Sequence, residues 1–367
     1  MSTTSPVQHA LSIRELLFRI FSNSNTDSNA VNARVCKLWA NEALSINWYS
    51  IDADALLNLL KLEGPQAWVR FDEYAWRVHV LSVGIDFDFP YIVRSQILTT
   101  KFNRNRPLVP NLTTLTIDFD FDSVNDIIYL FESPSVRSLT LSPYIFDDLW
   151  MCSKPFEMAL KILRSALVNM PSLRTLRVPE YRECEGGSIA VQAFTSIIGE
   201  FDQLEEVQIP AFWLADPVVD SLASLPGLRS LDIPMLLSPS PALFTTIPPI
   251  SDSYFPSLEA LRMDTSFSKA IKWLSHPRFP KTLTSLSIHL RRNGVDRSAD
   301  CLAHLFAAIG SQLRNLRTLD FEEPSFHRFD ASCSFESMRP LLSLSDLRHM
   351  TLKMRYTIVV VNICIDL

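Results

Sequence analysis

Apolar residues recur along the chain in one spacing: an apolar residue, two variable residues, a second apolar residue, one variable residue and a third apolar residue. The last two apolar positions alternate with a variable one, which is typical of a short strand with one buried face. One copy means little, but nine copies start 24 to 37 residues apart. Strands of this kind can stack in parallel and share a core. The copies start at Leu112, Val136, Leu173, Leu204, Leu228, Leu258, Leu283, Leu316 and Leu347.

Helical spacing appears between several copies. Residues 156–167, 194–201 and 302–309 each place apolar side chains on one helical face, whereas 238–249 is rich in proline and predicts a loop. Strands that alternate with helices indicate an α/β solenoid with a parallel sheet on its concave side. The sequence resembles the leucine-rich repeat family, and the resemblance implies one irregular solenoid over residues 78–355.

A further repeat before these nine can be read in two registers. The apolar positions are Val78, Leu81 and Val83 in the first register, and they shift by two residues in the second. The phrase Ile-Asp-Phe-Asp-Phe occurs at 85–89 and again at 117–121, which favours the second register. The family resemblance favours the first, so the sequence leaves both open.

Residues 11–48 carry a helical pattern of another kind. A first helix is predicted over residues 13–21, a polar loop over 22–29 and a second helix from Val31 to Trp39. Two or three short helices cannot bury their own apolar side chains, so they need a partner surface, either the solenoid or another protein. The apolar stripe of the first helix consists of Ile13, Leu16, Leu17, Ile20 and Phe21.

Two stretches of these helices carry a second family resemblance. Glu15-Leu16-Leu17, followed by Val35-Cys36-Lys37-Leu38-Trp39, resembles the F-box family, and residues 68–78 are similar to the joint after the F-box in many fungal F-box proteins. Arg14 stands where the family usually has proline, which favours a helix start but is not essential to it. The resemblance implies an F-box over 11–52, a helical joint over 53–77 and docking on the Skp adaptor of cullin-based ubiquitin ligases.

The F-box resemblance also implies which residues touch the adaptor. The alternative is that helices 12–48 only cap the open end of the solenoid, as terminal repeats do. The adaptor-binding candidates are Ile13, Leu16, Leu17, Ile20, Phe21, Val35, Cys36, Trp39, Leu44 and Trp48.

Composition narrows the choice of partner and compartment. A net charge of −6 and a pI of about 5.7 offer no basic surface for phosphate backbones, so nucleic acid is a poor candidate partner. The six cysteines are scattered without a C-x-x-C pair, which fits a reducing compartment. The first residues lack the pattern of a signal peptide, and no apolar run is long enough to span a bilayer. We expect a soluble cytoplasmic or nuclear protein whose residues 1–10 are disordered and which has no membrane partner.

The sequence offers no catalytic or cofactor motif. The eight glycines form no phosphate-binding loop, and the seven histidines show no metal-ligand spacing. Asp118, Asp120 and Asp122 alternate as in a calcium loop, but the phenylalanines between them and the missing glycine argue against one. We therefore expect a non-catalytic chain without a cofactor, with catalysis supplied by partner subunits.

The variable residue between the last two apolar positions of each repeat points outward on the concave face. These residues alternate in charge and include no aromatic one, which suits a hydrated face and a protein-binding face equally well. If the face binds a target, the candidates are Arg177, Gln208, Asp232 and Arg262. Together with the F-box resemblance, this predicts the substrate-recognition subunit of a Skp–cullin–F-box ubiquitin ligase. The alternative is a non-degradative scaffold that binds the Skp adaptor without a cullin.

Residues 356–367 form an atypical hydrophobic tail. The stretch from Tyr356 to Ile365 is uncharged and rich in β-branched residues, and it lacks the polar outer face of a terminal repeat. We expect an incomplete repeat or a truncated gene product.

Overall fold

The computed structural model describes residues 10–60, 65–84, 99, 106–119, 128–143, 154–178, 188–210, 216–234, 255–277, 279–290, 299–322, 335–354 and 357–362. They form two compact units, Met1–Tyr144 with Val168–Ser172, and Ile145–Leu167 with Leu173–Leu367. The disorder expected at residues 1–9, the proline-rich loop at 238–249 and Asp120 and Asp122 of the calcium-like stretch lie outside the described residues.

The first unit begins with three short helices around a small core of their own. Leu17, Phe21 and Ala43 form this core, and Trp39 packs against it with its ring edge toward Phe21, 5.3 Å between centroids. Asn25 starts the second helix by accepting a hydrogen bond from the backbone N–H of Ser28. The helices are α2 (Arg14–Ser22), α3 (Thr26–Asn32) and α4 (Lys37–Asn47).

The predicted helix over Val31–Trp39 is therefore wrong in its bounds. The chain leaves helical geometry after α3, and Cys36 is extended, with φ of −159° and ψ of 169°, immediately before α4. Val35 and Cys36 consequently lie in the turn between two helices. The start of α3 also falls inside the polar stretch that was predicted to be a loop, because Asn25 supplies an N-cap there.

Parallel strands follow these helices in the first unit. They lie side by side in chain order. Leu81 pairs with Leu115 and Val83 with Ile117, so the additional repeat uses the first of the two possible registers. The elements are β1 (Ser50–Asp52), α5 (Ala53–Leu57), η1 (Asn58–Leu60), α6 (Pro65–Ala75), β2 (Val80–Val83), β3 (Thr114–Phe119), α8 (Ile128–Phe131) and β4 (Ser138–Pro143).

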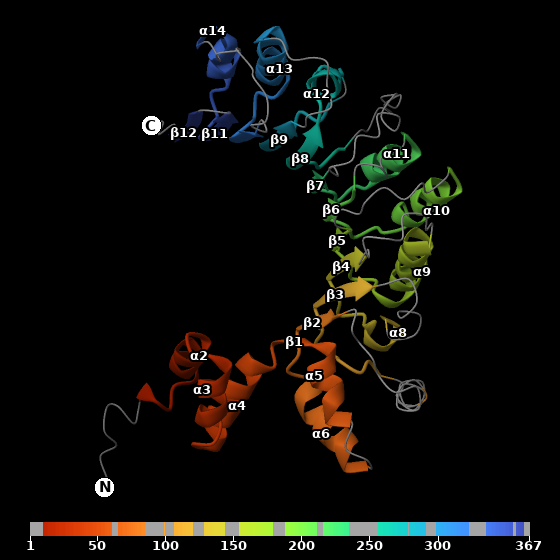
Figure 1. Ribbon diagram of the computed structural model, residues 1–367, viewed down its shortest axis with the longest axis vertical. Coiled ribbons are helices and arrows are strands. Elements are labelled where there is room, and N and C mark those ends of the chain that lie inside the picture. The colour runs from red at the N-terminus through yellow and green to blue at the C-terminus, as the bar shows by residue number, and fades with distance from the viewer. Residues whose placement is uncertain are drawn as a thin grey trace, which may run out of the picture. The chain divides into compact units, whose positions relative to one another are not determined.

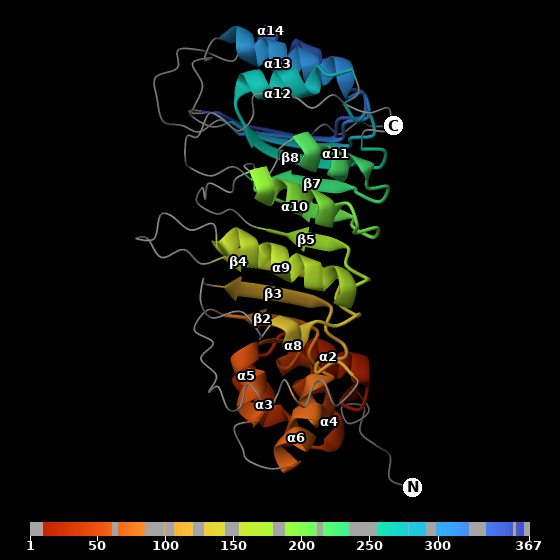
Figure 2. The ribbon, with the colours of Figure 1, turned by 90° about the vertical axis from the view of Figure 1, so that its right-hand side faces the viewer.

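The second unit repeats strand and helix in the same manner (Figures 1 and 2). Its strands β5 to β11 pair in parallel, each with the strand of the next repeat. The predicted fold class, an α/β protein with parallel strands built from leucine-rich repeats, is confirmed. Its strands are β5 (Thr175–Arg177), β6 (Glu206–Gln208), β7 (Ser230–Ile233), β8 (Ala260–Thr265), β9 (Ser285–Leu290), β10 (Thr318–Glu322), β11 (His349–Met354) and β12 (Thr357–Asn362).

Helices of the second unit cover one face of its strands, as both views show. Among its described residues, no helix lies on the opposite face, which we call the open face. The predicted helices over 156–167, 194–201 and 302–309 correspond to α9, α10 and α13. The helical elements are α9 (Lys154–Asn169), α10 (Ser188–Ile198), α11 (Asp216–Ser224), α12 (Phe267–Leu274), α13 (Ala299–Gln312), α14 (Phe335–Met338) and η4 (Arg339–Ser343).

The apolar positions of the repeats form the core, as the sequence predicts. All nine residues that open a repeat are at most 2% exposed. Helices complete this core: Phe306 of α13 meets Phe321 of β10 with ring centroids 5.6 Å apart. Burying each such side chain contributes roughly 1.5–3 kcal/mol to stability.

Main-chain hydrogen bonds join consecutive repeats just before strands β2 to β4 of the first unit and β6 to β11 of the second. The carbonyl of Glu205, for example, accepts the N–H groups of Arg229 and Ser230 at 2.8 and 3.0 Å. The same double acceptance recurs from Tyr49 in the first unit to Arg317 in the second. Backbone groups thus satisfy one another at the turn into the strand, and the Asn111 and Asn315 side chains add hydrogen bonds to carbonyls of the preceding repeat.

The hydrophobic tail pairs with the last repeat. Residues Thr357–Asn362 form β12, which runs antiparallel to β11, and Val360 lies opposite Thr351. The strand of the tail therefore continues the hydrogen bonding of β11, but it runs opposite to the strands of the repeats. Residues 363–367 lie outside the described part.

Candidate functional site

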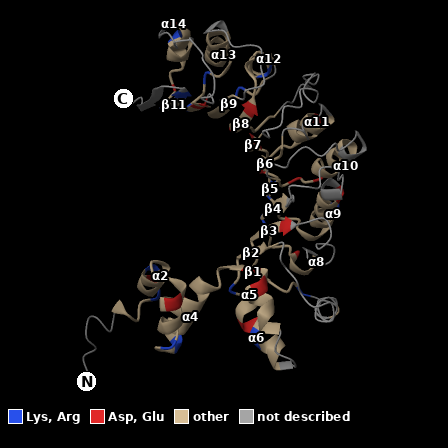
Figure 3. Ribbon diagram, in the orientation of Figure 1, with Lys and Arg blue, Asp and Glu red and all other residues tan. Residues whose placement is uncertain are grey.

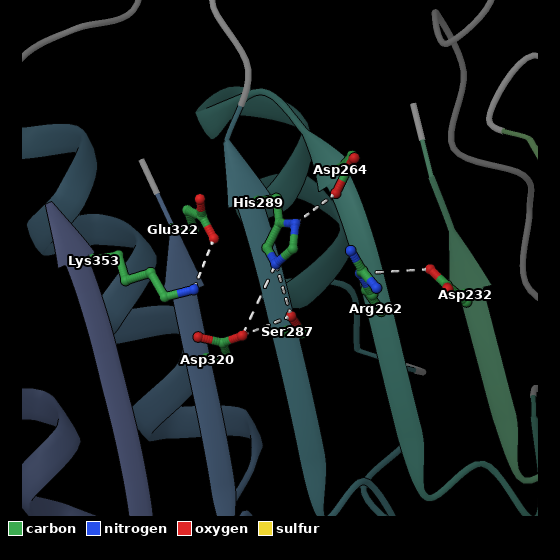
Figure 4. Close-up of polar contacts among 8 residues, drawn as sticks. All are labelled: Asp232, Arg262, Asp264, Ser287, His289, Asp320, Glu322 and Lys353. Carbon is green, nitrogen blue, oxygen red and sulfur yellow. Dashed lines mark hydrogen bonds and ion pairs between the residues drawn. The ribbon is translucent and has the colours of Figure 1, made fainter. Parts of the chain in front are cut away.

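The open face of the second unit carries two columns of polar side chains. The first column is the variable position between the last two apolar residues of each repeat, and the second lies two residues further along the strand, on the same face. Prolines at 210 and 234 take the second position after β6 and β7. Proline cannot donate to a ladder, so these strands end early and the second column begins only at β8. We call the following residues the polar cluster: Asp232, Arg262, Asp264, Ser287, His289, Asp320, Glu322 and Lys353 (Figure 4).

The four residues predicted to bind a target lie on consecutive strands of the first column. Arg177, Gln208, Asp232 and Arg262 are in register across β5 to β8. Arg177 lies 3.4 Å from a carboxylate oxygen of Glu206, and the Arg262 Nε lies 3.8 Å from the Asp232 Oδ1. Both arginine side chains remain about half exposed, at 52% and 51%. These are surface ion pairs that contribute little to stability and leave the guanidinium groups accessible.

His289 stands at the centre of the polar cluster. Its Nδ1 lies 3.1 Å from the Asp264 Oδ1, and its Nε2 lies 3.2 Å from the Ser287 Oγ. On the far side, Nε2 is 3.9 Å from the Asp320 Oδ2. The hydrogen bond with Asp264 raises the pKa of His289 above its ordinary value of 6.5, against the opposing effect of burial. The cluster therefore favours the imidazolium form of this side chain.

Two aspartates of the cluster are held in a partly dry environment. Burial raises the pKa of Asp232, although Arg262 opposes this shift. The Asp320 Oδ2 accepts a long hydrogen bond from the Ser287 hydroxyl at 3.5 Å, whereas its Oδ1 has no hydrogen-bond partner and no contact with solvent. The Asp320 side chain as a whole is 36% exposed, so its accessible part is presented on the open face while Oδ1 is buried.

Ser287, His289 and Asp264 follow the order of a nucleophile, a base and an orienting acid. Hydrolysis also needs donors aimed at the developing oxyanion. The neighbouring backbone N–H groups are engaged, because β9 is paired along residues 285–290 with both β8 and β10. In the described part of the chain, no group of three or more potential ligands is placed to hold a metal ion. The contacts between the side chains of the cluster are hydrogen bonds and ion pairs.

The predicted adaptor-binding residues divide into buried and exposed sets. Leu17 and Phe21 are 0% and 1% exposed and belong to the core of α2 to α4, so they are unavailable to a partner while this core is intact. Ile13, Trp39, Leu44 and Trp48 are half-buried, whereas Cys36 is exposed. Leu16, Ile20 and Val35 are 41%, 48% and 59% exposed.

Two exposed apolar side chains were missing from the predicted set. Phe18 is 52% exposed on α2 and Val31 is 64% exposed on α3. Phe18 was missed because it falls outside the helical stripe, although a surface residue of a docking helix need not belong to the stripe that forms the core. Leu16 and Ile20 lie one helical turn apart, on a flank of α2 away from Leu17.

Arg14 and Arg77 hold the N-terminal helices in place. Arg14 at the first turn of α2 forms an ion pair of 2.5 Å with the carboxylate of Glu42, whose side chain is 5% exposed. Arg77, just before β2, donates to the carbonyl of Asn41 at 3.0 Å and to the Ser45 hydroxyl at 2.7 Å. Both contacts end on α4, so this helix is tied to α2 and to the first strands.

Among known proteins, this chain is similar to solved structures of low sequence identity. No known family profile and no curated protein matches the sequence. A crystal structure of a TLR13–ssRNA13 complex is similar with 15% identity and a TM-score of 0.35, over 76% of this chain and only 39% of that chain. The leucine-rich repeat-containing protein LegL7 from Legionella pneumophila is similar with 13% identity and a TM-score of 0.39, over 90% and 94% of the two chains. The fold class rests on strand order and register, and these likenesses carry no argument about partners.

None of the described helices combines the length and the apolar character needed to cross a bilayer. Figure 3 shows acidic and basic positions on both helices and strands.

Proposed function

We propose that this chain is the target-binding subunit of a Skp–cullin–F-box ubiquitin ligase. In this proposal α2 to α4 dock on the Skp adaptor and the open face of the repeats holds a target protein. Solenoids of stacked repeats present extended binding surfaces, and the chain would contribute proximity and specificity while partner subunits perform catalysis.

The observation that carries the proposal is the apolar surface of α2. Leu16, Phe18 and Ile20 are 41% to 52% exposed on a single helix of nine residues. The same helix contains the Glu15-Leu16-Leu17 stretch of the F-box resemblance. Leu16 and Ile20 are neighbours one helical turn apart, whereas Phe18 lies on the opposite flank of the helix. Exposed apolar side chains that lie side by side are typical of a protein-interaction site. Val31 and Val35, of which Val35 opens the second stretch of the resemblance, are also exposed, at 64% and 59%.

A non-degradative scaffold that binds the adaptor without a cullin is the second candidate. The same exposed residues support it, because adaptor docking is common to both functions. Affinity purification of the full chain separates them: adaptor with cullin supports the ligase, and adaptor alone supports the scaffold. Recovery of neither supports the interpretation that the helices only cap the repeats.

A pair of variants tests the docking surface itself. Leu16→Asp places a charge where adaptor contact would desolvate it, so adaptor capture is expected to fall at least tenfold, as for a central interface residue. Leu342→Asp is the matched control, because Leu342 is 66% exposed in η4 of the other unit. Equal capture by the two variants would refute docking through α2.

A further inference from the structure

The polar cluster carries more negative than positive charge. It has four carboxylates on Asp232, Asp264, Asp320 and Glu322, and only two permanent cations, on Arg262 and Lys353 (Figure 4). Arg262 faces Asp232, and Lys353 faces Glu322 at 3.2 Å. The remaining two carboxylates, Asp264 and Asp320, share His289. Whether Asp320 has a positive charge beside it therefore depends on the protonation of the His289 imidazole.

The hydrogen bonds of Ser287 link the protonation of His289 to Asp320. When His289 is charged, Nδ1–H donates to Asp264 and Nε2–H to the Ser287 Oγ, which leaves the Ser287 hydroxyl proton for Asp320. When His289 is neutral and keeps its proton on Nδ1, Nε2 accepts a hydrogen bond from the Ser287 hydroxyl. Asp320 then loses both its donor and the nearby positive charge. All these distances lie between 3.1 and 3.9 Å.

We infer that Asp320 and Glu322 receive two alternate arginines of an extended segment of a partner protein, and that protonation of His289 closes this site. The two acidic residues are two apart on β10, which matches the spacing of same-side residues in an extended peptide. Arginine suits this position because its guanidinium is always charged and forms charge-assisted hydrogen bonds with carboxylates. The exposed Lys353–Glu322 pair, with side chains 47% and 43% exposed, is readily exchanged for such a contact.

The inference rests on the proposed role of the repeats in holding a target, and it names the chemistry of that target. His289 is faced by Asp264 and Arg262 of β8, by Asp320 and Glu322 of β10 and by Ser287 of its own strand. Asp232 of β7 and Lys353 of β11 complete the charged surroundings. Of these groups, only His289 has an ordinary pKa within the range of pH 5.5 to 8.5.

The test is a binding titration on the full chain by fluorescence anisotropy. The probe is a labelled peptide, Ser-Arg-Ser-Arg-Ser with blocked ends, and its control is the same peptide with glutamate in place of arginine. At about pH 8.5 the arginine peptide is expected to bind, and Asp320→Asn to raise its Kd by about tenfold. Asp118→Asn, an equivalent change on β3 of the other unit, is expected to leave the Kd unchanged.

Acidification supplies the second readout. Lowering the pH to about 5.5 protonates His289 and is expected to weaken binding several-fold in the unmodified chain, but not in His289→Gln. Absence of arginine-peptide binding, equal binding by Asp320→Asn, preference for the glutamate peptide or an unchanged pH effect in His289→Gln would each overturn the inference. Thermal unfolding of each variant confirms that it is folded. Adaptor capture, measured separately, should be unaffected by Asp320→Asn, so loss of capture in the unmodified chain counts against the ligase proposal alone.

Discussion

Adjacent leucines on α2 are expected to have separate roles, one in folding and one in binding. Leu17 is fully buried against Phe21 and Ala43, so Leu17→Ala removes buried apolar atoms and leaves a cavity. Such changes cost about 2–5 kcal/mol. A loss of about 3 kcal/mol corresponds to a roughly 100-fold larger open population. Because this helical core is small, we expect that loss to appear locally in α2 and α4.

Hydrogen exchange measured by mass spectrometry can resolve this difference. Peptides from α2 and α4 should lose roughly 100-fold in protection in Leu17→Ala, with peptides from β8 to β10 as the internal reference. Leu16→Ala, at a side chain that is 41% exposed, should change stability by no more than about 0.5–1 kcal/mol while weakening adaptor capture. Unchanged protection of α2 in Leu17→Ala would refute the assignment of this core. Loss of α2 protection in Leu16→Ala would refute the separation of roles.

Other perturbations test the repeats and their joint. Gly310→Ala would place a Cβ against the Pro340 carbonyl oxygen. It should lower the free energy of unfolding, measured with denaturant, by about 1–3 kcal/mol. The control Gly199→Ala meets no atom closer than 3.6 Å and should be tolerated. Arg77→Met removes three hydrogen bonds to α4 and should speed hydrogen exchange there, with a cost of about 2–3 kcal/mol. The pKa of His289 is raised in the folded state. Its contribution to stability is therefore complete below about pH 6.5 and is lost as the pH rises through the raised pKa. Unfolding measured from about pH 5 to 9 should show this loss of stability in the unmodified chain and a smaller loss in His289→Gln. Deletion of β12 exposes the edge of β11 and should increase aggregation in light scattering.

The repeats could be predicted because one spacing of apolar residues determines both strand and core. The variable residue between the second and third apolar positions must face outward, so the line from Arg177 to Arg262 followed from periodicity alone. The second column could not be predicted in this way. The repeated spacing ends at the third apolar residue, so it does not define how far each strand continues. The sequence did contain a signal for the longer strands. The position two residues after the first column holds proline at 210 and 234, but Asp264 and His289 in the next two repeats.

The N-terminal helices show a different limit of sequence reasoning. A stripe that includes Leu16, Leu17 and Phe21 covers a wide arc of helix, and spacing alone does not tell which part faces the core. The chain is extended at Cys36, between α3 and α4, so a continuous apolar pattern concealed two helices. Strand β1 was missed because its three residues contribute little apolar character, and it is recognisable only through its pairing with β2.

The pairing of β1 with β2 determines where this protein can be divided for domain exchange. A cut after Asp52, at the boundary that motif resemblance implies, would remove the partner strand of β2 and separate Arg77 from its acceptors on α4. A chimera joined there would leave an unpaired strand in each piece, β1 in one and β2 in the other, and an unsatisfied guanidinium on Arg77 in the second. A transplant that includes everything through β2 keeps these contacts within one piece. The helices and the first strands are thus one module for engineering, although their sequences belong to different patterns.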